Sequence, residues 1–177
     1  MTILDLIQKT TAYFEKAGVT TSRLEVELLL AHALKLKRMD LYLQFERQLP
    51  EAELDRLRPL VKRRAAREPL QHIMGQVEFC GVEIRCTPQA LIPRPETELV
   101  VQRAIQLLTT PSSVSSSQQS SVFDIGTGSG AIALAIAHAC PAITCVAIDV
   151  SEDALALARS NAEKTGLQER VKFRHGN

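Results

Sequence analysis

Three glycines alternate with small polar residues in FDIGTGSGAIALAIA, residues 123–137. An apolar run precedes them and a run of helix-forming residues follows, a pattern that predicts a strand, a tight turn and a helix. Such a turn aims backbone N–H groups and the positive end of the helix at a bound molecule. Glycine also lets that molecule approach the bare main chain closely. The stretch is therefore a candidate ligand-binding turn.

Two ligand classes compete for this turn. Gly126-x-Gly128-x-x-Ala131 satisfies the short dinucleotide fingerprint, whereas Asp124-x-Gly126-x-Gly128-x-Gly130 satisfies the longer pattern of S-adenosylmethionine-dependent methyltransferases. Asp149 ends the next apolar run, where a carboxylate can accept both ribose hydroxyls in either class. A dinucleotide fold usually opens on the glycine strand, but here a helical region and a hairpin come first. That order favours the methyl donor over a dehydrogenase cofactor and over a turn without a ligand.

The elements before the turn are predicted to form a small helical bundle over residues 1–75. The first helix would place one stripe toward the core, made of Leu6, Ile7, Thr10, Tyr13 and Phe14. Ser22 and Glu25 have the spacing of a capping box ahead of a second helix. A further helix follows Pro50, with Pro59 inside it as a potential kink.

The pattern changes after Pro69. Alternating apolar residues around Cys80-Gly81 predict a β-hairpin linker over residues 76–93. Pro95 suits the first turn of the following helix. The polar run PSSVSSSQQSS, 111–121, is predicted to be a surface insertion. From Val122 a β-α-β-α-β order predicts an α/β fold, a partial Rossmann-like domain over 94–177.

Composition excludes several other classes. With 45% hydrophobic residues, 23% charged residues and a net charge of +1, the chain is predicted to be globular, without a field that would attract nucleic acid. The cysteines form no C-x-x-C pair, so we expect reduced thiols and no metal site. Neither a targeting segment nor a membrane span is predicted, which favours the cytoplasm. A basic run is interpreted as a solvated face, with a protein or RNA contact as the alternative: Arg56, Arg58, Lys62, Arg63, Arg64 and Arg67.

Four segments, in order along the chain, resemble the peptide chain release factor N5-glutamine methyltransferases. They are EPLQHIMGQVEFCG, ALIPRPETELV, FDIGTGSGAIALAIA and AIDVSEDALALARSNAE. The resemblance implies transfer of a methyl group from S-adenosylmethionine to the glutamine side-chain amide of the GGQ loop in class 1 release factors. It also implies that the helical domain holds the protein substrate.

Carried over by position, the resemblance implies a donor site and a substrate side. Donor-binding residues would be Gly126, Thr127, Gly128, Ser129, Gly130, Asp149 and Asn177. Among them, the turn would cradle the methionine end, Asp149 would hold the ribose, and Asn177 would lie near the adenine. The substrate side would include Arg94, Glu96 and Thr97. Capping of the helix that starts here is an equal explanation for Glu96.

The family's N-P-P-Y motif, which holds the substrate amide, does not occur in these 177 residues. We therefore expect an N-terminal portion of a longer enzyme, with no catalytic residue of its own and little or no methyl transfer. Two alternatives stay open. One is a related N-P-P-Y methyltransferase acting on another protein glutamine or on adenine, and the other is a non-catalytic module that binds release factor or S-adenosylmethionine.

Overall fold

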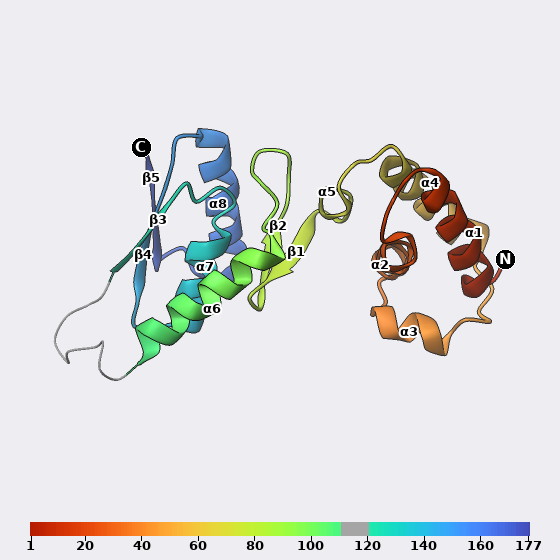
Figure 1. Ribbon diagram of the computed structural model, residues 1–177, viewed down its shortest axis with the longest axis horizontal. Coiled ribbons are helices and arrows are strands. Elements are labelled where there is room, and N and C mark those ends of the chain that lie inside the picture. Colours follow the sequence, from red (N-terminus) through yellow and green to blue (C-terminus); the bar gives the residue numbers. More distant parts are fainter. Residues whose placement is uncertain (111–120) are drawn as a thin grey trace. The chain divides into compact units, whose positions relative to one another are not determined.

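The computed structural model describes residues 1–110 and 121–177 (Figure 1). The chain divides into two compact units, Met1–Met74 and Gly75–Asn177. The first is helical and the second is α/β, in the predicted order. The polar run, predicted to be an insertion, lies outside the described residues except for Ser121, which begins a strand.

The helical unit contains α1 (Ile3–Lys16), α2 (Ser22–Leu34), α3 (Arg38–Leu43), α4 (Glu51–Ala65) and α5 (Leu70–Met74). As predicted, α1 buries Ile7, Thr10 and Phe14. Tyr13, expected on the same stripe, is instead 49% exposed. Helix α4 runs through Pro59 without ending there. The buried faces of α1, α2 and α4 meet in one apolar core.

The predicted capping box at Ser22 and Glu25 is wrong. Thr21 is the residue that caps α2, and its hydroxyl donates to the Glu25 carboxylate at 2.9 Å instead of accepting a backbone N–H. The Ser22 hydroxyl donates to the Val19 carbonyl (2.6 Å) and is buried. A capping box does form at α1, where Thr2 and Asp5 exchange side-chain and backbone hydrogen bonds. Because Thr21 and Ser22 are adjacent and both are common N-cap residues, the sequence pattern misplaced the N-cap by one residue.

The α/β unit contains β1 (Gln76–Phe79), β2 (Val82–Arg85), α6 (Pro95–Thr109), β3 (Ser121–Ile125), α7 (Ala131–Ala139), β4 (Thr144–Asp149), α8 (Glu152–Thr165) and β5 (Val171–His175). Strands β1 and β2 form the predicted antiparallel hairpin, with Cys80 and Gly81 both at positive φ in the turn. We expected this hairpin to be a linker. It lies within the second unit, where Phe79, Val82 and Ile84 are buried in the core.

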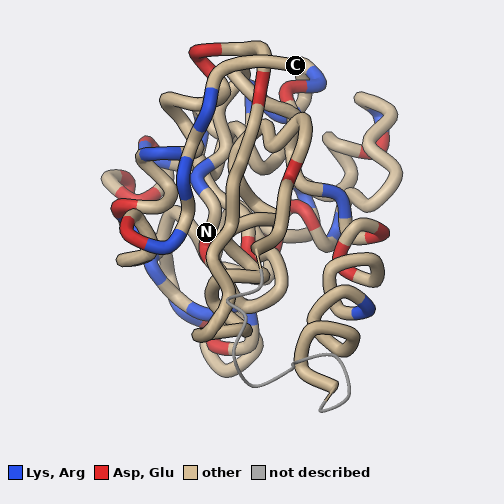
Figure 2. Tube along the Cα trace, turned by 90° about the vertical axis from the view of Figure 1, so that its left-hand side faces the viewer, with Lys and Arg blue, Asp and Glu red and all other residues tan. Residues whose placement is uncertain are grey.

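Strands β3, β4 and β5 form a parallel sheet in that order. Helices α7 and α8 lie on one side of it, and the hairpin lies beyond them (Figure 1). The residues that face these helices alternate along the strands and belong to the core, for example Cys145 and Ala147 of β4. The other face of β3 carries Phe123 and Ile125, which are 64% and 71% exposed. The charged positions of these strands are Asp124 of β3, Asp149 of β4, and Lys172 and Arg174 of β5; Figure 2 colours acidic residues red and basic residues blue along the chain.

Burial also determines the state of the cysteines. All of them are free, and Cys86, Cys140 and Cys145 are buried. Loss of solvation, reinforced by the nearby Asp124 carboxylate, raises the pKa of Cys145 to about 11, so this thiol is unreactive at neutral pH. Among the described residues, no helix is both long and apolar enough to cross a membrane.

Candidate functional site: the glycine turn

The glycine turn joins the carboxyl end of β3 to the start of α7. Gly126, Gly128 and Gly130 all have positive φ, at 77°, 56° and 82°, which explains why glycine occupies each position. The N–H groups of Gly126 and Thr127 both donate to the carbonyl of Ile148 on β4, at 2.8 and 2.9 Å. The turn is thus fixed to the neighbouring strand as well as to its own helix.

Asp124 supports the turn from inside the protein. Its carboxylate is 8% exposed and accepts the Thr127 hydroxyl at 2.7 Å and the Ala133 N–H at 3.2 Å. Loss of solvation outweighs these two hydrogen bonds and raises the pKa of Asp124, with a smaller contribution from Asp149. Asp124 therefore acts as a buried anchor of the turn and does not face the solvent.

Asp149 lies where β4 ends, as the sequence predicted, and it contacts the turn directly. Its Oδ2 accepts the N–H of Gly128 at 2.8 Å, and its Oδ1 accepts the N–H of Ser151 at 2.9 Å. Each carboxylate oxygen can accept two hydrogen bonds, so each retains one acceptor position. Two such positions on one fixed carboxylate suit a ligand with two neighbouring hydroxyl groups.

A cavity of about 140 Å³ joins the turn to the segment that precedes α6. The predicted donor residues that line it are Gly126, Thr127, Gly128 and Ser129, and the predicted substrate-side residues are Arg94 and Thr97. Leu91, Ile92 and Pro93 complete an apolar wall. The structure therefore brings two sequence-distant segments, both singled out in advance, to one hollow.

The turn retains hydrogen-bond donors for a ligand. Within the described part of the chain, the N–H groups of Ser129, Ala131 and Ile132 have no protein acceptor. They belong to the first residues of α7 and the turn before it, where the helix dipole is positive. A carboxylate, such as that of an amino-acid moiety, fits these donors. The residues present thus match both ends of a nucleoside linked to an amino acid.

Three further predicted residues, Gly130, Glu96 and Asn177, do not line the cavity. Gly130 is buried behind it, and a Cβ there would meet the Ala158 Cβ at 3.1 Å. Glu96 is exposed in the first turn of α6 and does not line the cavity. Asn177 is exposed beyond β5, directly after Gly176, whose N–H donates to the Asp149 carbonyl at 3.0 Å. Asn177 therefore lies at the same edge of the sheet as Asp149.

Sequence reasoning missed Asn161, a fully buried residue of α8. Its side chain contacts the backbone of both Ser129 in the turn and Arg85 in β2. A signal was available, because Asn161 interrupts an apolar helix stripe that includes Leu157, Ala158 and Ala162. A polar residue at such a position needs internal hydrogen-bond partners.

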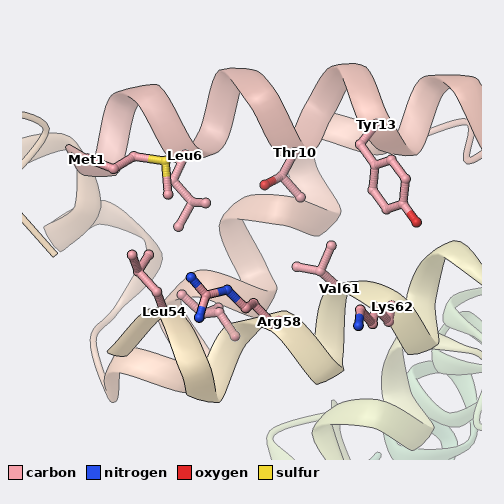
Figure 3. Close-up of a pocket in the computed structure, with 9 residues that line it drawn as sticks. Met1, Leu6, Thr10, Tyr13, Leu54, Arg58, Val61 and Lys62 are labelled. Atoms are coloured by element: carbon pink, nitrogen blue, oxygen red, sulfur yellow. The ribbon is translucent and has the colours of Figure 1, made fainter. Parts of the chain in front are cut away.

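A second hollow, in the helical unit, offers no comparable chemistry. A groove of about 270 Å³ separates α1 from α4, and side chains from both helices point into it (Figure 3). Its lining is mainly apolar but includes two hydroxyl groups and two cationic side chains: Met1, Leu6, Thr10, Tyr13, Leu54, Leu57, Arg58, Val61 and Lys62.

Most side chains of the basic run 56–67, in and just after α4, pair with acceptors inside the helical unit. Its pairs are Arg58 with Glu51 and Asp55, Arg63 with Glu68, Arg64 with Glu25, and Arg67 with the Gly18 carbonyl. In the described chain, Arg56 and Lys62 have no carboxylate partner. This pairing supports the interpretation of a structural and solvated face over that of a free basic surface.

Comparison with known proteins assigns both units. The PrmC N-terminal domain model matches residues 5–75, and a methyltransferase domain model matches residues 116–177. The release factor glutamine methyltransferase of Chlorobaculum tepidum is 41% identical over 171 residues, which is 97% of this chain and 58% of that protein. By sequence, the chain is thus similar, across both units, to release factor glutamine methyltransferases.

Other relatives give the same picture. The release factor glutamine methyltransferase of Geobacter sulfurreducens is 43% identical over 167 residues, and that of Deinococcus radiodurans is 40% identical over 177 residues. These matches cover 94% and 99% of this chain but 56% and 60% of the relatives. The chain thus spans little more than half the length of the relatives it matches.

Proposed function

We propose that the glycine turn binds S-adenosylmethionine and that the chain serves methylation of the GGQ glutamine amide in class 1 release factors. The observation that carries the proposal is the cavity shared by the turn and the Arg94 segment, beside the fixed Asp149 carboxylate. In this assignment the N–H groups of Ser129, Ala131 and Ile132 donate hydrogen bonds to the donor's amino-acid carboxylate. Asp149 accepts the ribose hydroxyls, and Asn177 lies on the adenine side.

The charges around the turn favour this donor over a dinucleotide. Asp124 and Asp149 are both carboxylates without an ion-pair partner in the described chain. They favour the positive sulfonium of S-adenosylmethionine, whereas a pyrophosphate gains no such attraction from them. Arg94 at the far wall is the basic residue that lines the cavity. A dehydrogenase cofactor is therefore disfavoured on electrostatic as well as on family grounds.

The substrate assignment follows from the chemistry and from the relatives' names. When bound, the donor supplies an electrophilic methyl group, so the protein must orient the acceptor nitrogen rather than generate a strong base. Residues of this chain that could flank an incoming side chain are Arg94 and Thr97, across the cavity from Thr127 and Ser129. The proposed partner is a class 1 release factor, with no nucleic-acid substrate, and the proposed location is the cytoplasm.

Calorimetric titration of the purified chain with S-adenosylhomocysteine tests the donor site. We expect saturable binding that Asp149→Ala weakens about tenfold or more, because the ribose would lose a charge-assisted hydrogen bond. NAD should give no heat. Binding of NAD without binding of S-adenosylhomocysteine would overturn the proposal.

A radiolabelled methyl-transfer assay tests the substrate. A full-length relative should label a class 1 release factor, and a release factor with the GGQ glutamine changed to alanine should stay unlabelled. The chain itself, run in parallel, separates the enzyme assignment from the alternative of a non-catalytic binding module. Labelling of DNA or RNA instead of the release factor would favour the adenine-methylating alternative.

A further inference from the structure

Asn161 connects three elements of the α/β unit through one side chain. From α8, its Nδ2 donates to the Ser129 carbonyl at 2.9 Å and to the Arg85 carbonyl at 3.3 Å. Its Oδ1 accepts the Arg85 N–H at 2.9 Å. The side-chain amide therefore pairs with Arg85 as a neighbouring strand would, while its second donor reaches the glycine turn.

The contact between α8 and the turn is close as well as polar. Ala158 lies one helical turn before Asn161 on the same face, and it faces Gly130 so closely that a Cβ on Gly130 would be 3.1 Å from its Cβ. Small residues thus let α8 approach the turn, and Asn161 then fixes the Ser129 carbonyl. With that carbonyl turned toward α8, the peptide groups of the turn are held in one orientation.

Arg85 gives the same side chain a link to the other wall of the cavity. Arg85 ends β2, and the chain continues from it through residues 86–94 to Arg94, which lines the cavity opposite Ser129. Ala90, within this stretch, lies beside Gly128, since a Cβ there would be 3.8 Å from the Ala90 Cβ. Asn161 therefore holds the starting points of both walls at once.

We propose that Asn161 is a positioning residue that sets the spacing between the donor-binding turn and the substrate-side segment 86–94. This inference rests on the proposed function, because it assigns those two walls to the donor and the substrate. Asn161 itself is buried and touches neither. Its effect is exerted through the carbonyl of Ser129 and the backbone of Arg85.

Two variants and one control test the proposal in the 177-residue chain. Asn161→Asp keeps the shape and the acceptor of Arg85 but places a carboxylate against two carbonyl groups. Asn161→Ser keeps a hydroxyl too short to bridge both partners, and it is the milder change if Asn161→Asp fails to fold. Leu167→Ala is the control, because Leu167 is buried in the same core and has no hydrogen bond to the turn in the described structure.

Amide hydrogen exchange in the free chain is the first readout. Gly126, Thr127 and Gly130 in the turn and Cys86 at the start of segment 86–94 should exchange about tenfold faster in both Asn161 variants, relative to Ile136 in α7, because one hydrogen bond of ordinary strength is lost at each wall. In Leu167→Ala these ratios should stay as in the unmodified chain. Unchanged ratios in the Asn161 variants would overturn the proposal.

Affinity for S-adenosylhomocysteine is the second readout. We expect a loss of about tenfold in Asn161→Ser and a larger loss in Asn161→Asp, against less than about twofold in Leu167→Ala measured where it is fully folded. Full affinity in both Asn161 variants would refute the positioning role and leave the donor site standing. If the unmodified chain itself binds no S-adenosylhomocysteine, the proposed function fails, and the exchange ratios still decide the role of Asn161.

Discussion

Among the described residues, each unit contains one buried carboxylate, and the two have opposite surroundings. Glu27 in the helical unit is 1% exposed and receives hydrogen bonds from Arg23, Arg38 and Tyr42. Burial opposes its ionisation, but these donors outweigh burial and lower the pKa of Glu27. Asp124 in the α/β unit is 8% exposed, receives only neutral donors, and has a raised pKa.

The contrast indicates what each unit is built for. The helical unit pairs its charges internally, so that Glu27 joins α2 to α3 and Arg64 joins α4 to α2. The α/β unit leaves Asp124 without a cation at the base of a turn that also has unused N–H groups. A buried charge without a counter-ion destabilises a fold, and such charges cluster at functional sites. The comparison therefore supports the proposal that the second unit contains the binding site.

Removing the paired carboxylate should give the largest effect on stability. Glu27→Ala removes the common hydrogen-bond acceptor of Arg23, Arg38 and Tyr42. We expect this to lower the free energy of unfolding by about 2–3 kcal/mol. The loss is at the low end for a broken buried pair because Arg23 and Arg38 can return to solvent. Urea denaturation followed by circular dichroism measures it.

Glu15→Ala, at an exposed position of α1 without an ion pair in the described chain, is the matched control and should change stability by less than about 0.5 kcal/mol. Equal effects of the two substitutions would remove the contrast between the units, because Glu27 would then be no more than a surface charge in energetic terms.

The turn itself should give the next largest effect. Gly130→Ala forces a side chain into the left-handed region and against Ala158, so we expect a loss of about 2 kcal/mol. Gly126→Ala has the same backbone requirement but no atom within 4 Å of the new Cβ, and it should lose about 1 kcal/mol. The difference between the two, read from thermal or urea unfolding, isolates the contact with α8. No difference would mean that α8 adapts freely to the turn.

Much of this architecture could be predicted from local sequence. Gly81, Pro95, Ser151 and Gly166 mark the hairpin turn, the start of α6, the N-cap of α8 and its left-handed end, and each does so in the structure. These signals work because each is a conformational preference of one residue. The pattern from Asp124 to Gly130 likewise predicted a tight turn, and each of its glycines has positive φ in the structure.

What could not be predicted depends on contacts between distant segments. Nothing local shows that Asn161 bonds to Ser129 and Arg85, or that the hairpin packs into the second core. The inward direction of Asp124 was also hidden, because the pattern treats it as part of the glycine motif and gives no burial. The ion pair between Glu27 and Arg38 could not be predicted either, because it depends on how α2 and α3 pack together. Such features require the assembled fold, and they are the ones that distinguish the two units.

The smallest expected effect is a difference in pH dependence, and it bears most directly on the comparison. Because the folded pKa of Asp124 is raised, the folded state holds the proton more tightly than the unfolded state. Its contribution to stability is therefore full below the unfolded pKa and is lost as pH rises through the folded pKa. Asp124→Asn should accordingly gain stability relative to the unmodified chain as pH rises above the unfolded pKa of about 3.9.

Glu27→Gln should show the opposite slope. The folded pKa of Glu27 is lowered, so its contribution is present above the unfolded pKa and is lost as pH falls through the folded one. Relative to the unmodified chain, this variant should therefore lose stability as pH rises through the acidic range. Urea midpoints measured for both variants across that range decide the matter, since slopes of the same sign would mean that the two carboxylates share one kind of environment. Opposite slopes would show that the carboxylate beneath the glycine turn lacks the cationic partners that lower the pKa of Glu27.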